Sequence, residues 1–96
     1  MEHFNFQFNN CKSEEDIKNV IENVLAYQNI VDNDDDAAQW FKDAGIEDDV
    51  KTQPILSTRV GVWNEEYEGE ELFTVVVKEH YTGPGSDDYV YSYIIA

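Results

Sequence analysis

Carboxylates are the side chains of this sequence whose spacing could do chemistry, and they are densest in residues 31–41, VDNDDDAAQWF. Asp32, Asp34 and Asp36 fit the first, third and fifth positions of the helix-loop-helix calcium pattern, and Asp43 fits the twelfth. That pattern needs glycine at its sixth position, where the chain has Ala37, and a bidentate glutamate at its twelfth. Because both requirements fail, we expect no calcium or other metal here, and no cofactor.

The same aspartates have a structural interpretation, because they precede a predicted helix. Acids at an N-cap and in a first helical turn accept hydrogen bonds from free N–H groups and face the positive end of the helix dipole. One or two acids are enough for this purpose. The chain has four within residues 32–36, followed by Asp43 and the acids of residues 47–49. The surplus indicates a binding role.

Catalytic patterns are weak by comparison. His3 and His80 fall on different predicted strands, and Cys11 has no partner for a disulfide or a zinc site nearby in the sequence. No glycine-rich phosphate loop and no basic patch are present. We therefore expect neither enzymatic activity nor direct binding of nucleic acid.

Charge is the outlying property of the chain. Its 96 residues include 21 acids and 6 lysines or arginines, giving a formal net charge of −15, yet 42% of them are hydrophobic. That hydrophobic share favours a folded chain, and we expect a single domain over residues 1–96. A strongly negative field attracts cationic partners and repels nucleic acid. No apolar run approaches the ~18 residues of a membrane span, so we expect a cytoplasmic protein with a basic partner and no membrane association.

Two helices and four strands are expected to position the acids. Apolar residues at helical spacing after Ser13 predict a helix over residues 13–28 with a serine cap, and residues 36–45 predict a shorter one ending at Gly45. Alternating phenylalanines predict a strand at 3–8, and β-branched and aromatic runs predict strands at 55–64, 71–81 and 88–96. The order is β-α-α-β-β-β, an α+β fold with an antiparallel sheet of about four strands and both helices on one face. The opposite face would then be rich in aromatic residues, which favours a homodimer or partner surface as much as a covered one.

Two features of the sequence resemble a known group of proteins. They are the acidic, aromatic segment WNEEYEGEELF, residues 63–73, and the overall size and charge of the chain. Small size, strong acidity, an α+β pattern and few cations resemble the DNA-mimic proteins of phages and mobile elements, including Arn-like anti-restriction proteins, uracil-DNA glycosylase inhibitors and anti-CRISPR proteins. The segment itself is similar to one in a phage inhibitor of a CRISPR nuclease. The resemblance implies a non-enzymatic inhibitor, acting in the host cytoplasm if phage-encoded, whose acids replace phosphates in the DNA-binding groove of a restriction, CRISPR or repair nuclease.

On this hypothesis, the acids act as phosphate substitutes and two aromatic residues, Trp63 and Tyr67, anchor the interface. The expected partner-binding acids are Asp32, Asp34, Asp35, Asp36, Glu47, Asp48, Asp49, Glu65, Glu66, Glu68, Glu70 and Glu71. Two alternatives stay open: an immunity protein that neutralises a nuclease toxin, and a calcium-binding or scaffold module.

Overall fold

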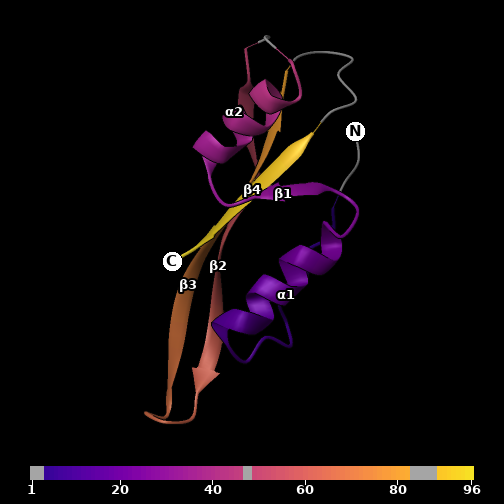
Figure 1. Ribbon diagram of the computed structural model, residues 1–96. Coiled ribbons are helices and arrows are strands. Elements are labelled where there is room, and N and C mark those ends of the chain that lie inside the picture. The colour runs from indigo at the N-terminus through magenta and orange to yellow at the C-terminus, as the bar shows by residue number, and fades with distance from the viewer. Residues whose placement is uncertain (1–3, 47–48, 83–88) are drawn as a thin grey trace.

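The computed structural model of the chain describes residues 4–46, 49–82 and 89–96 (Figure 1). Two helices and four strands follow one another as α1 (Glu14–Val24), β1 (Asn29–Val31), α2 (Asp34–Asp43), β2 (Lys51–Asn64), β3 (Gly69–Tyr81) and β4 (Val90–Ile95). The predicted α+β class, with two helices and a four-stranded sheet, is confirmed. No helix in the described ranges is both long and apolar enough to cross a membrane.

The helix boundaries follow local capping chemistry. Ser13 caps α1 as predicted, its Oγ accepting a hydrogen bond from the Asp16 N–H at 3.3 Å. The cap of α2 is Asn33, whose Oδ1 accepts from the Asp36 N–H at 2.9 Å, so the aspartates fill the first turn and do not cap the helix. Gly45 follows α2 with φ of +80°, a left-handed conformation that favours glycine, as expected from its place in the sequence.

The strand order in the sheet is β1-β4-β3-β2. The β2–β3 and β3–β4 pairs are antiparallel, whereas β1 is parallel to β4. The sheet is therefore mixed, and the expectation of a wholly antiparallel sheet is wrong for the β1–β4 pair. Tight turns between consecutive strands produce antiparallel neighbours, but β1 and β4 are separated in the chain by α2, β2 and β3, so no turn dictates their direction.

The strand predicted at residues 3–8 is the main error in element assignment, since residues 4–8 form no strand and residue 3 lies outside the described residues. Phe4, Phe6 and Phe8 are half-buried against the core while the residues between them are exposed. The Phe4 ring meets the Tyr91 ring edge-on, with 5.4 Å between centroids. The alternation thus predicts burial correctly, but the segment packs on the sheet without pairing with it.

The two helices lie on opposite faces of the sheet. Ile17 and Ile21 of α1 share a buried cluster with Tyr91 of β4, whereas the preceding strand residue, Val90, packs with Phe41 of α2. Because successive strand residues point to opposite faces, the expectation that both helices cover one face is wrong. We call these faces the α1 face and the α2 face.

Strand β1 explains why the helices separate. It lies between α1 and α2 in the chain, and its neighbours Ile30 and Val31 pack into the α1 cluster and the α2 cluster respectively. Tyr91 is 4% exposed and Tyr93 half-buried beneath the α1 side of the molecule. The tyrosine-rich face is therefore covered, and the face left partly open is the α2 face.

The molecule is elongated, with principal extents of 51 × 24 × 18 Å. Its long axis follows the β2–β3 hairpin, whose turn lies at the end of the molecule opposite α2 (Figure 1). The acids of the hairpin turn and those of α2 are therefore held at different ends of the molecule.

Candidate functional site

The turn of the β2–β3 hairpin, residues 63–71, is the most exposed acidic and aromatic segment of the described chain, and we call it the hairpin tip. Asn64 Oδ1 accepts from the Glu66 N–H at 2.9 Å, and Glu68 adopts a left-handed conformation with φ of +49°, which together close the turn. Trp63 and Tyr67 are 59% and 62% exposed. The tip thus presents two uncovered aromatic rings among carboxylates.

A hydrogen bond orders one of these rings. The Tyr67 hydroxyl donates to Glu71 Oε2 at 3.1 Å, and this bond to an anion raises the pKa of Tyr67. The phenol therefore stays protonated and carries no additional negative charge near neutral pH. A fixed, neutral aromatic ring beside carboxylates suits contact with a cationic surface.

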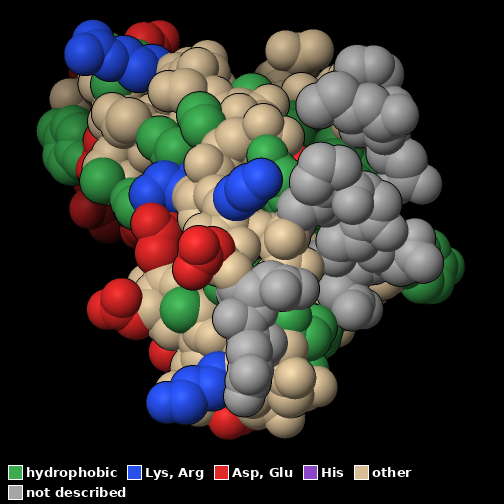
Figure 2. Space-filling model, turned by 90° about the horizontal axis from the view of Figure 1, so that it is seen from above, with side chains coloured by type: hydrophobic (Ala, Val, Ile, Leu, Met, Phe, Trp, Pro, Cys, Tyr) green, Lys and Arg blue, Asp and Glu red, His purple; other side chains and the backbone are tan. Residues whose placement is uncertain are grey.

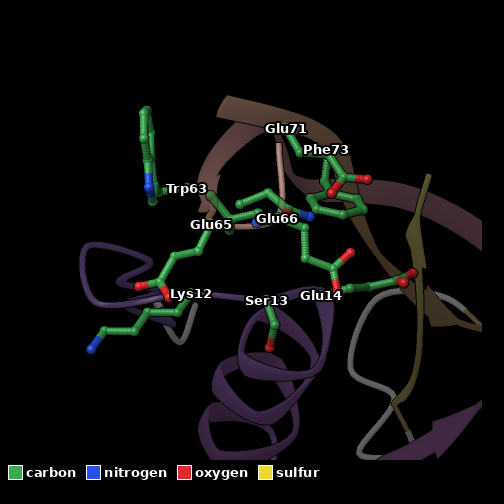
Figure 3. Close-up of a pocket in the computed structure, with 10 residues that line it drawn as sticks. Lys12, Ser13, Glu14, Trp63, Glu65, Glu66, Glu71 and Phe73 are labelled. Atoms are coloured by element: carbon green, nitrogen blue, oxygen red, sulfur yellow. The ribbon is translucent and has the colours of Figure 1, made fainter. Parts of the chain in front are cut away.

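A surface hollow of about 700 Å³ separates the hairpin tip from the start of α1 (Figure 3). Its walls include carboxylates from both elements, and Trp63 lies at its rim. Val62 and Phe73 contribute apolar surface, and Lys12 contributes a positive charge. The lining residues are Lys12, Ser13, Glu14, Val62, Trp63, Asn64, Glu65, Glu66, Glu71 and Phe73. The hollow offers carboxylate oxygens and an aromatic ring to an arginine or lysine side chain of a partner.

Glu14 joins this site although sequence reasoning missed it. It lies in the first turn of α1, about fifty residues from the tip in the chain, and it reaches the hollow because α1 packs its apolar stripe on β2 and β3. The sequence shows the acids of this first turn and the stripe, but not the register at which the helix meets the sheet.

The acids at the start of α2 form a separate group, which we call the α2 acids. Asp32, Asp34, Asp35 and Asp36 are all exposed, as is Asp49 just before β2. Lys78, which binds Asp34, is eight residues from Glu70 along β3, a separation of about 26 Å at about 3.3 Å per residue. The structure therefore does not unite the α2 acids with the hairpin tip. Glu47 and Asp48 lie outside the described residues.

The acids do not form one continuous patch on the face drawn in Figure 2, where red groups are separated by tan, green and blue side chains. Asp34 is partly neutralised, because the Lys78 ammonium lies 3.0 Å from its Oδ2. Residues 34–43 are helical, so Asp34, Asp36 and Asp43 do not belong to a calcium-type loop. Within the part of the chain that the structure describes, no cluster of three or more acids, histidines or cysteines could hold a metal ion.

A buried polar network fastens α2 to the sheet. His80 is fully buried, with Nδ1 2.8 Å from Thr52 Oγ1 and Nε2 2.8 Å from Ser92 Oγ. The Ser92 hydroxyl donates to Asp34 Oδ1 at 3.4 Å. A neutral His80 fits this pattern, with Nε2–H donating to Ser92 and Nδ1 accepting from Thr52.

This network is built for positioning. His80 is fully buried and Ser92 is only 3% exposed, so both side chains lie inside the protein. Burial lowers the pKa of His80, while Asp34 nearby opposes the shift and Lys78 reinforces it. The neutral histidine therefore holds β3, β4 and the first turn of α2 together.

Comparison of the chain with protein families, with curated proteins and with solved structures gave no match.

Proposed function

We propose that this protein is a non-enzymatic inhibitor that binds a basic, DNA-binding enzyme through its hairpin tip and occupies the groove in which that enzyme holds DNA. The observation that carries the proposal is the hollow lined by Glu14, Glu65, Glu66 and Glu71, with the exposed Trp63 at its rim (Figure 3). Carboxylates from two distant segments share a site there with an anchor of the type enriched in protein interfaces. The candidate enzymes are restriction, CRISPR and repair nucleases.

Long-range and short-range forces have different parts in this proposal. The net charge of −15, including the α2 acids at the far end, provides the field that accelerates the approach of a cationic partner. Trp63 and Tyr67 then supply apolar contact area, while the tip carboxylates replace phosphates against arginine and lysine. Inhibition follows because the enzyme cannot hold DNA and the inhibitor in one groove.

The test compares two triple variants of equal net charge. Glu65→Gln, Glu66→Gln and Glu71→Gln remove three charges at the tip, and Asp35→Asn, Asp36→Asn and Asp49→Asn remove three at the other end. Nucleases from the three classes are first screened for inhibition of DNA cleavage by the wild-type protein. Against a nuclease that is inhibited, the tip variant is expected to lose at least ~100-fold in affinity and the matched control less than ~5-fold.

Equal losses in the two variants would show that net charge alone matters and would contradict the tip as the binding site. The proposal also requires DNA to compete with the inhibitor and affinity to fall steeply with salt. An enzyme that binds DNA and this protein simultaneously would exclude groove occupation and favour the immunity-protein alternative, in which binding lies beside the active site.

A further inference from the structure

The α2 face of the sheet is covered only in part. α2 packs on β1 and β4 at one end of this face. Toward the hairpin tip, Leu72 and Ile94 point from the same face and are 58% and 51% exposed. Trp63 also stands on this face, since its neighbour Val62 is buried on the α1 face. Uncovered apolar side chains on a flat strand surface mark an interaction surface.

The open part of the α2 face differs from the rest of the molecule in charge. In the register of β2, β3 and β4, the residues that share it are Ser57, Arg59, Gly61, Trp63, Glu70, Leu72, Thr74, Val76 and Ile94. Its charged members, Arg59 and Glu70, have opposite signs, so this surface is near neutral in a chain of net charge −15. Two copies of the chain, which repel each other through their acids, can approach here with the least repulsion.

The register also makes this surface self-complementary. Gly61 pairs with Leu72, and Arg59 and Trp63 stand two residues on either side of Gly61. A two-fold axis across the strands at this pair would place Leu72 against Leu72 of a second copy, and Arg59 over the Trp63 ring of that copy. Such reciprocal contacts are what a symmetric dimer requires, and an arginine over an indole ring is attractive.

Glu70 adds a negative charge close to the axis. Glu70 pairs with Trp63 across the strands, and its side chain reaches back over Gly61. A Cβ at position 61 would lie only 2.7 Å from the Glu70 carboxyl carbon, so only glycine leaves room for this side chain. The Glu70 carboxylates of the two copies therefore face each other near the axis, and the Arg59 guanidinium groups on either side of them offset their repulsion. In the symmetric arrangement, Arg59 of one copy meets both the Trp63 ring and the Glu70 carboxylate of the other.

We propose that the open part of the α2 face binds a second copy of this chain and forms a homodimer. The part of the surface that this symmetric contact covers runs from Arg59 to Trp63 on β2 and from Glu70 to Thr74 on β3, about 13 Å along two strands, which makes it a small, weak interface. The dimer is accordingly concentration-dependent, with a dissociation constant in the micromolar range or weaker.

Sedimentation velocity of the full chain, from about 10 to 500 µM at about 0.15 M ionic strength, tests the proposal without any target enzyme. We expect a monomer–dimer equilibrium. Leu72→Glu, which places two new carboxylates against each other, is expected to weaken dimerisation at least ~10-fold. Tyr27→Glu, at a residue 99% exposed and outside this surface, is the matched control and should leave the equilibrium unchanged. Circular dichroism confirms that both variants are folded.

A charge exchange makes the test specific. Arg59→Glu and Glu70→Arg should each weaken the dimer, and the double variant should restore it to within ~3-fold of wild type, because the pairing across the axis is re-formed. A wild-type chain that stays monomeric throughout the concentration range would overturn the proposal. A dimer insensitive to Leu72→Glu, or one that the double variant fails to restore, would do the same.

The measurement uses the protein alone, so its outcome is distinguishable from that of the target screen, although the dimer covers Trp63 and would compete with a target that binds this residue. If Leu72→Glu lowers affinity for a target enzyme while the wild-type protein is monomeric, the surface belongs to the target interface and the homodimer is overturned. If the homodimer is found and no nuclease is inhibited, the proposed function fails and the dimer stands.

Discussion

His80 Nε2 lies 2.8 Å from Ser92 Oγ inside the protein, joining β3 to β4 directly beneath the first turn of α2. His80 is completely buried and Ser92 almost so, and both remain fully hydrogen-bonded through Thr52 and Asp34. Buried polar groups that are all paired favour one arrangement of the surrounding elements, because any displacement leaves a group without a partner.

The lowered pKa of His80 predicts a loss of stability on the acid side of neutrality. The unfolded chain protonates this histidine near its ordinary pKa of 6.5, while the folded chain resists protonation. Since the unfolded state then binds more protons, the free energy of unfolding falls as the pH drops below about 6.5 and levels off below the folded pKa. Urea unfolding at pH 7.5, 6.5 and 5.5 measures this. His80→Gln should show a flatter dependence, and parallel curves for the two proteins would refute the assignment.

Asp34 is expected to act on stability more than on target binding. It binds Lys78 at 3.0 Å and Ser92 at 3.4 Å, although its side chain is about half exposed and solvent weakens the ion pair. We expect Asp34→Asn to lower the free energy of unfolding by about 1 kcal/mol. Asp35→Asn, in the same helical turn, is the control and should change it by less than about 0.5 kcal/mol. If both substitutions lowered the free energy of unfolding equally, Asp34 would stabilise the protein through the helix dipole and not through the buried network.

Tyr93 should ionise at a higher pH than an ordinary tyrosine. Burial, together with its hydrogen bond of 3.0 Å to Glu22, raises the pKa of Tyr93 to about 12. Because the folded pKa is above the ordinary value of 10, the associated stability is present below pH 10 and is lost as the pH rises from 10 toward 12. Absorbance titration of phenolate follows this directly. Tyr93→Phe should remove a step near pH 12, and an unchanged titration curve would contradict the placement of Tyr93.

The core beneath α1 should be sensitive to truncation. Ile21 is fully buried against the sheet on the α1 face. Ile21→Ala is expected to lower the free energy of unfolding by about 2–5 kcal/mol, since it removes buried apolar contacts and leaves a cavity. Tyr27→Ala, at the fully exposed end of the same segment, should stay within about 0.5 kcal/mol of wild type by chemical denaturation. A small effect at Ile21 would mean that α1 does not pack as described.

Local chemistry is readable from the sequence where neighbours in the chain decide the outcome. Ser13 as a cap, Gly45 after α2, and the hairpin turn between two β-rich runs all depend on residues a few positions apart. The same is true of the α+β class. These features were predictable because backbone hydrogen bonding and side-chain periodicity act over short distances.

Tertiary structure decided how those elements combine. The parallel pairing of β1, the placement of α1 and α2 on opposite faces, and the packing of Phe4 without strand pairing depend on which apolar surfaces meet. The same packing brought Glu14 to the hairpin tip and held the α2 acids at the other end. The sequence by itself determined that the protein is strongly acidic and that Trp63 and Tyr67 lie among its acids. Only the burial of two apolar helix stripes against one sheet decided which acids share a surface, because hydrophobic contact is non-directional and its partners are not encoded by spacing along the chain.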